Sequence, residues 1–197
     1  MRHCKLLLAA ACCAVLLSAL VGSASAGRLS TVTQTFRSSF RSVSLNGVFG
    51  SITCQMSLEG SLHSRTIAKS SGTLIGYVTA AALGTCAEGR ATILRETLPW
   101  HVRYASFSGT LPNITSIRVN VSGFSLRIQE PFAGCLWRSE AANPLIITLN
   151  REAGGSLTTA ELGGTMPSTC GFSGTASSDR APVTILNSTV RVTVTLI

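Results

Sequence analysis

Residue types that carry catalysis or bind metals are scarce in this chain of 197 residues. Beyond residue 26 it has two histidines, one aspartate and seven glutamates, and these are scattered. Gly-x-Ser-x-Gly and Ser-x-x-Lys motifs are absent, which argues against the common serine-hydrolase classes. The chain also lacks a Gly-x-x-x-x-Gly-Lys phosphate loop and a multi-carboxylate calcium loop. Nucleotide-dependent and calcium-loop functions are therefore disfavoured.

Long apolar runs are also missing, with one exception at the start of the chain. A short basic segment at residues 2–5 precedes the uncharged run Leu6–Val21, and Ala24–Ala26 supplies the small residues that a signal peptidase needs. Because 16 apolar residues fall short of the roughly 20 that span a bilayer, cleavage is favoured over a retained anchor. The sequence predicts a signal peptide over residues 1–26, cleaved between Ala26 and Gly27, and a secreted domain over residues 27–197 without a transmembrane anchor.

Lysine is nearly absent from that domain, and its cations form no cluster. Lys69 is the only lysine, and 13 arginines are spread singly between Arg28 and Arg191. With 14 basic and 8 acidic residues the domain carries a net charge of 14 − 8, or +6. A nucleic-acid-binding protein concentrates its cations on one stripe, so we expect no nucleic-acid partner. An extracellular ligand such as an anionic glycan or cell-wall polymer suits the charge better.

Cysteine is present in an informative number. Three of the seven cysteines fall within the predicted signal peptide, which leaves Cys54, Cys86, Cys135 and Cys170. An even number in an exported chain indicates two disulfides. Of the three possible pairings we favour Cys54–Cys86 and Cys135–Cys170, since each closes a loop of about 30 residues. The spacing does not match a zinc site, and we expect no metal and no cofactor.

Alternation of Val, Ile and Thr with polar residues is the dominant pattern of the domain, and it is typical of half-buried strands. The predicted strands cover residues 52–58, 73–79, 91–96, 100–105, 117–121, 124–128, 145–149 and 190–194, with a bend at Gly123 inside one long ribbon. The predicted turns lie at residues 46–47, 71–72, 111–113, 154–155 and 163–164. Many short strands at this spacing predict a single all-β domain, either an antiparallel sandwich or a barrel.

One segment supports a resemblance. Pro99–Tyr104, leading into Phe107–Pro112, together with the preference for arginine over lysine, resembles secreted, uncharacterised β-rich proteins of high-GC Gram-positive bacteria. The resemblance implies export and a β-rich fold. It brings no known activity and no catalytic residues.

The candidate chemical residues are few. His63 and His101 fall on predicted strands among outward-facing neighbours, which favours a surface position. The alternative is that both converge with Glu96 or Glu130 as an acid/base or metal site.

Three aromatic residues, Trp100, Tyr104 and Trp137, could form a binding platform for sugars or a partner. Packing in the core is the favoured interpretation, because large aromatics of a small set are usually buried.

The resulting hypothesis is a secreted, non-enzymatic extracellular binding or surface-associated domain. Two alternatives remain: a secreted hydrolase with a small His/Glu site, and a barrel whose apolar lumen binds a small lipophilic ligand.

Overall fold

The computed structural model describes residues 28–48, 50–129, 134–152 and 156–196. Most of them lie in β-strands, so the all-β prediction is confirmed. The strands that build the main body are β2 (Thr35–Gly47), β3 (Gly50–Leu62), β5 (Leu74–Ala87), β7 (Trp100–Thr110), β8 (Asn113–Ser122), β11 (Leu145–Arg151), β12 (Leu157–Pro167), β13 (Ser173–Ser178) and β14 (Ala181–Ile185).

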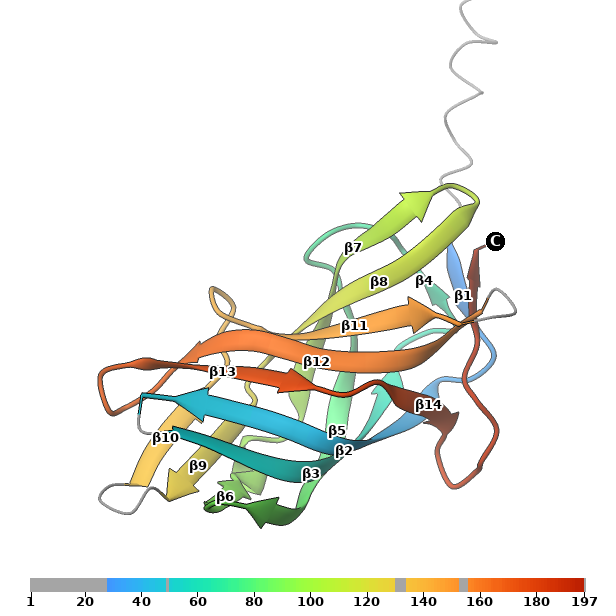
Figure 1. Ribbon diagram of the computed structural model, residues 1–197. Coiled ribbons are helices and arrows are strands. Elements are labelled where there is room, and N and C mark those ends of the chain that lie inside the picture. The colour runs from blue at the N-terminus through green and yellow to red at the C-terminus, as the bar shows by residue number, and fades with distance from the viewer. Residues whose placement is uncertain (1–27, 49, 130–133, 153–155, 197) are drawn as a thin grey trace, which may run out of the picture.

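Antiparallel pairing joins these strands in chain order. β2 pairs with β3, β3 with β5, β5 with β7, β7 with β8, β8 with β11, and β11 with β12. β13 and β14 each pair with β12 on one side and with β2 on the other, which closes the ring. The fold is therefore an up-and-down barrel of seven strands plus one position shared by β13 and β14 (Figure 1).

The break between β13 and β14 is bridged by side chains on both sides. Leu162 of β12 lies between the residues that pair with β13 and those that pair with β14, and its N–H donates to Ser178 Oγ at 2.8 Å. On the other side, the N–H of Ser42 donates to Asp179 Oδ1 at 3.2 Å, and the N–H of Asp179 donates to the Ser42 carbonyl at 3.1 Å. These bonds replace the ladder where the strand is interrupted.

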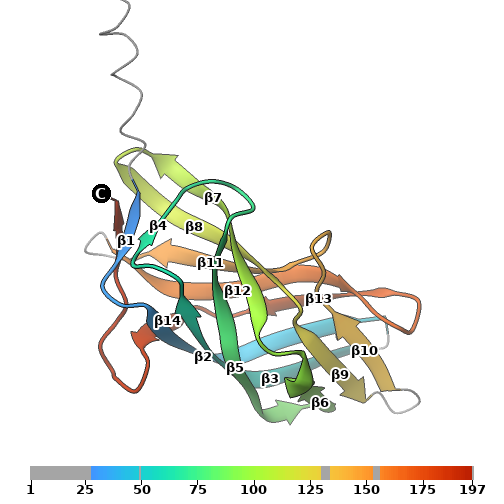
Figure 2. The ribbon, with the colours of Figure 1, turned by 180° about the vertical axis from the view of Figure 1, so that it is seen from behind.

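A small sheet covers the end of the barrel where β2 finishes. It consists of β6 (Arg90–Ile93), β9 (Ser125–Gln129) and β10 (Gly134–Arg138), in the order β10–β9–β6 (Figure 2). Trp137 of β10 is 1% exposed and lies so close to Gly174 of β13 that a Cβ there would meet its ring at 2.0 Å. Phe124 packs edge-on against Trp100 with ring centroids 5.0 Å apart. Large aromatic side chains fill this half of the barrel.

Three short strands lie at the opposite end: β1 (Leu29–Thr31), β4 (Thr66–Ile67) and β15 (Val194–Leu196). β1 pairs with both β15 and β4, and Val194 pairs with Leu157 of the barrel. Figures 1 and 2 both place β1, β4 and β15 together, far from the β6–β9–β10 sheet. These strands cap the second end of the barrel.

Two predictions were based on glycine positions: the turn at residues 163–164 is wrong, and the bend at Gly123 is right only in part. Residues 163–164, predicted as a turn, lie inside β12. Gly164 has a φ of +146°, and a Cβ added to it would lie 2.9 Å from the Pro144 carbonyl oxygen. A close backbone approach therefore explains the glycine at position 164, whereas a Cβ at Gly163 would meet nothing nearer than 3.9 Å. At Gly123, with a φ of +96°, the predicted bend is present, but the chain leaves the barrel there and enters the small sheet as β9.

Three further boundaries differ from those predicted. The strand predicted over residues 91–96 ends at Ile93, because the chain then turns through the 3₁₀ helix η1 (Arg95–Thr97). Thr97 Oγ1 stabilises this helix by donating a hydrogen bond to the Leu94 carbonyl at 2.7 Å. Of the three valines predicted to share a face in residues 190–194, Val192 and Val194 are buried, but Val190 is 58% exposed because β15 begins only at residue 194. Residues 46–47 end β2 instead of forming a turn. The predicted turns at 71–72 and 111–113 are found, with β8 beginning at residue 113, whereas that at 154–155 falls outside the described residues.

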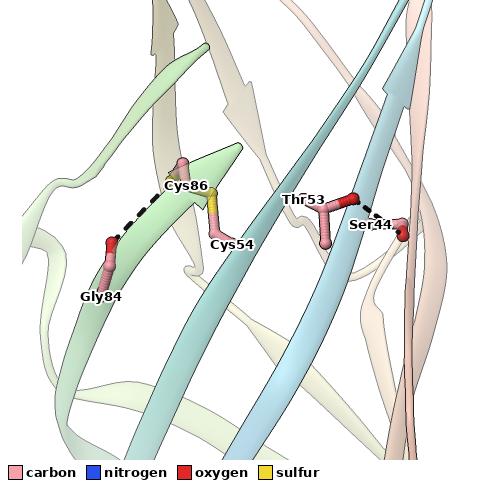
Figure 3. Close-up of a disulfide and its surroundings, with 5 residues drawn as sticks. All are labelled: Ser44, Thr53, Cys54, Gly84 and Cys86. Atoms are coloured by element: carbon pink, nitrogen blue, oxygen red, sulfur yellow. Dashed lines mark hydrogen bonds between the residues drawn. A yellow bond between two sulfur atoms is a disulfide. The ribbon is translucent and has the colours of Figure 1, made fainter. Parts of the chain in front are cut away.

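Both predicted disulfides are confirmed. Cys54 and Cys86 face each other on β3 and β5 with Cα atoms 4.0 Å apart, beside the Ser44 and Thr53 hydroxyls (Figure 3). Cys135 and Cys170 tie β10 to the β12–β13 connection, and this bond fastens the small sheet to the barrel. By loop-closure entropy each stabilises the fold by about 3–4 kcal/mol.

The predicted signal peptide, residues 1–26, and its cleavage point before Gly27 lie outside the described residues. Within the ranges that are described, no helix has the length and apolar character needed to cross a bilayer.

Candidate ligand-binding cavity

An apolar cavity of about 80 Å³ lies at the end of the barrel that β1, β4 and β15 cap. Its walls come from the barrel strands and from the cap. The lining residues are Leu29, Thr31, Phe36, Leu62, Ile67, Ile75, Val102, Tyr104, Ile117, Val119, Ile147, Leu149, Leu157, Val183, Val192 and Val194. Only Thr31 and Tyr104 among these have polar side-chain atoms.

The contrast between the two halves of the barrel follows from side-chain size. Trp100, Phe124, Trp137 and Met166 fill the half beneath the small sheet and are at most 1% exposed. The inward positions of the other half are mainly Val and Ile, whose branched side chains are short. They cover the wall without reaching across an eight-stranded ring, so space remains at the centre.

Tyr104 contributes to the cavity wall, while its hydroxyl oxygen is enclosed by the surrounding packing and has no hydrogen-bond partner within the described structure. The residue lies on β7 and is 2% exposed. Burial raises the pKa of this phenol above its usual value of about 10, which extends the pH range over which the hydroxyl keeps its proton. The other hydroxyl, on Thr31, already donates to the Thr33 carbonyl at 2.5 Å.

A surface groove of about 160 Å³ adjoins the cavity. It is lined by Leu29, Pro112, Ile114, Arg151, Leu157, Val194 and Thr195. Leu29, Leu157 and Val194 also line the cavity, so β1, β15 and the start of β12 form the wall shared by the two spaces. Two of the three residues of this wall, Leu29 and Val194, belong to the short cap strands.

The segment that leads into β15 is joined to the barrel by backbone and side-chain contacts, among them the Val192 N–H donating to the Val183 carbonyl at 2.7 Å. The Arg191 guanidinium pairs with the Glu152 carboxylate, which also accepts a hydrogen bond from Thr158 Oγ1 at 3.0 Å. The Arg191 and Glu152 side chains are 50% and 37% exposed, and exposed pairs contribute only about 0–1 kcal/mol.

The two predicted histidines do come together, but on the outside of the barrel. His63 lies just after β3 and His101 on β7, and both side chains are exposed. Each contacts the ring of Tyr77 on β5, with centroids 5.0 Å and 5.4 Å away. The result is a row of rings on an outward face, not the concave acid/base site that the hydrolase hypothesis requires.

The carboxylates do not complete that site in the described part of the chain. Glu96 is exposed on η1, and Glu130 lies outside the described residues. Among the residues described, no three His, Cys, Asp or Glu side chains gather closely enough to hold a metal ion.

The three predicted aromatics are all buried, so they do not form an exposed platform. Trp100 and Trp137 belong to the packed half, and Tyr104 lines the cavity. The aromatic residue that reaches the outer face is Tyr77, which the sequence analysis missed. Residues 73–79 form an almost continuous apolar run, so the sequence does not indicate which of their side chains point outward. The side-chain directions also depend on a register shift between Leu74 and Gly76, which is visible only in the structure.

Comparisons of the chain with family models, with curated proteins and with solved structures find no match.

Proposed function

We propose that this protein is secreted and binds a small lipophilic molecule in the cavity of its barrel. The observation that carries the proposal is the cavity wall itself, in which 14 of 16 residues have purely apolar side chains. Two disulfides support an extracellular location, because such bonds persist in oxidising compartments.

The size of the cavity limits the ligand in the conformation seen here. A volume of about 80 Å³ is roughly half that of an engineered apolar cavity, of about 150 Å³, that binds benzene. Benzene has six heavy atoms, so a molecule of about three or four heavy atoms is the expected size for this cavity. A longer molecule would have to displace the wall formed by Leu29, Leu157 and Val194 and extend into the adjoining groove.

Binding of xenon and of isobutene, a hydrocarbon of four heavy atoms, tests the proposal. We expect both to perturb the NMR signals of the Ile117, Val119 and Ile147 methyl groups while leaving those of the packed half unchanged. The blocking variant Val119→Phe places a ring in the cavity and should abolish both effects. Val48→Phe is the matched control, because Val48 is 70% exposed and distant from the lining. Equal binding by wild type and Val119→Phe would overturn the proposal.

A second candidate concerns the outer row of rings. Acidic glycans are recognised by aromatic stacking and by cationic groups, and Tyr77 lies between two exposed histidines, with the exposed Arg103 two residues after His101 on β7. Retention of the protein on a polygalacturonate column should fall in Tyr77→Ala. Equal retention of both proteins would reject this surface as the glycan site.

A further inference from the structure

Exposed apolar side chains are unevenly distributed over the described surface. Four large hydrophobic residues are at least half exposed, namely Val32, Val48, Leu111 and Val190. Single exposed residues of this kind are ordinary, but three of these four belong to loops at the end of the barrel that β1, β4 and β15 cap. The fourth, Val48, lies at the other end, in the turn between β2 and β3.

The three loops reach the same end of the molecule. Val32 follows β1, Leu111 lies in the turn between β7 and β8, and Val190 lies between β14 and β15. Figures 1 and 2 show these connections at one extremity, on the right in the first view and on the left in the second. Pro112 lines the groove beside the cap strands, so the β7–β8 turn adjoins them. We call the surface that carries Val32, Leu111 and Val190 the cap face.

Arginines accompany these apolar residues. Arg28 precedes β1 and Arg65 precedes β4, while Arg151 ends β11 and Arg191 precedes β15. All four side chains are exposed. On the segments that carry them, the one carboxylate within the described residues is that of Glu152, which pairs with Arg191. The cap face is therefore positively charged.

We propose that the cap face docks on the surface of a bilayer that contains anionic lipids, with Val32, Leu111 and Val190 inserted among the headgroups. Basic side chains are attracted to such a surface, and apolar side chains beside them partition into the interface. The cavity lies behind the same cap, so docking brings it next to a source of lipophilic molecules. This use of the docking rests on the proposed function, whereas the contact with the bilayer is tested separately.

A bilayer fits the cap face better than a protein partner does. The three apolar side chains stand on separate loops, whereas protein interfaces centre on a contiguous, well-packed patch. A second copy of the chain would bring two sets of arginines face to face, which is unfavourable. An anionic lipid interface accepts scattered apolar side chains and carries the opposite charge.

Sedimentation with vesicles tests the docking. Vesicles of phosphatidylcholine and phosphatidylglycerol in equal amounts should bind the wild-type protein about tenfold or more tightly than vesicles of phosphatidylcholine alone, since each cation near an anionic surface contributes about fivefold. Added salt should weaken this binding, because it screens the attraction. No binding to the anionic vesicles, or equal binding to both kinds, would overturn the proposal.

Val190→Ser and Val48→Ser form a matched pair at opposite ends of the barrel. Val190→Ser should weaken binding to the anionic vesicles about threefold to fivefold, and Leu111→Ser about fivefold to tenfold, because each removes an apolar side chain from the interface. Val48→Ser should change it by less than about twofold, since this side chain stays in water. Equal losses in Val190→Ser and Val48→Ser would contradict docking by the cap face.

A measurement on the wild type gives the orientation without any substitution. A lipid that carries a gadolinium chelate on its headgroup is added to the anionic vesicles. It should broaden the NMR signals of the Leu111 and Val32 methyl groups more than those of Val48, because the broadening falls steeply with distance. The opposite order would show that another face meets the bilayer.

The outcomes for the cap face and for the cavity are separable. Docking is measured without a cavity ligand, so a protein that binds vesicles but neither xenon nor isobutene retains the docking and loses the proposed function. A protein that binds both probes but no vesicles shows the reverse.

Discussion

At the scale of single residues, Tyr104 gives the chain an alkaline pH dependence. Its pKa is raised by burial, so the folded state retains the phenolic proton above pH 10, where the unfolded chain releases it. The stability that this group contributes is fully present below its unfolded pKa of about 10, and it is lost as pH rises through the folded pKa.

The first prediction uses Tyr104→Phe to isolate that contribution. Between about pH 9 and pH 11 the free energy of unfolding should fall less steeply in the variant than in wild type, because phenylalanine does not ionise. At neutral pH the variant should be as stable as wild type, or more stable by about 1 kcal/mol, since an unpartnered hydroxyl is removed. Urea unfolding across this pH range measures both effects, and identical slopes would contradict the assignment to Tyr104.

The second prediction concerns Gly174, where a side chain has no room. An added Cβ would lie 2.0 Å from Trp137 Cη2, so Gly174→Ala should lower the free energy of unfolding by about 1–3 kcal/mol and change the near-ultraviolet circular dichroism of tryptophan. Gly163→Ala is the matched control on β12, because the nearest atom to its Cβ is the Ala176 carbonyl oxygen at 3.9 Å. Equal stability of the two variants would be inconsistent with this packing.

At the scale of elements, the interrupted position shared by β13 and β14 is held by a side chain. Ser178→Ala removes the acceptor of the Leu162 N–H and should cost about 1–3 kcal/mol, the penalty for an unpaired buried donor. Ser177→Ala, at the exposed neighbouring position, should change stability by less than about 0.5 kcal/mol. Chemical denaturation of the pair measures the difference, and similar losses in both would show that the bond to Leu162 is dispensable.

The elements also show what the sequence could predict. Alternation correctly located strands around residues 52–58, 117–121 and 145–149, because an inward and an outward face impose a period of two. It missed β2, β12, β13 and β14, in which serine, threonine and glycine occupy many positions and weaken the alternation. The glycine pair at 163–164 resembles a turn in sequence, yet it lies inside β12, where Gly164 permits a close backbone approach.

At the scale of the whole molecule, both disulfide pairings were predictable, since loop length alone favoured them. The closure of the barrel was not, because the pairing of β13 and β14 with β2 depends on backbone hydrogen bonds that leave no local pattern. The cavity could not be predicted either. Tyr104 was identified as a candidate residue from the sequence. The volume of a cavity, however, depends on the diameter of the barrel and on the combined volume of all inward side chains, and both are known only once the barrel is assembled.

The fourth prediction tests the contrast between the two halves of the barrel with one substitution on one strand. Val121→Ile, in the packed half of β8, should lower the free energy of unfolding by about 1–3 kcal/mol through overpacking. Val119→Ile, two residues away at the cavity, should leave stability unchanged or raise it by up to about 0.8 kcal/mol, the value of one buried methylene. Thermal unfolding compares them, and equal destabilisation would argue against a hollow half.

The closure of the ring has a consequence for the order of events during synthesis. Each of the first seven pairings joins barrel strands that are consecutive in the chain, whereas Ser42 of β2 meets Asp179 across 137 residues. A chain that emerges amino end first can add its hairpins one by one, but β2 keeps an unpaired edge until residues 173–185 have arrived. During that interval the edge is open to other chains, so crowding and the speed of delivery set the yield of native protein.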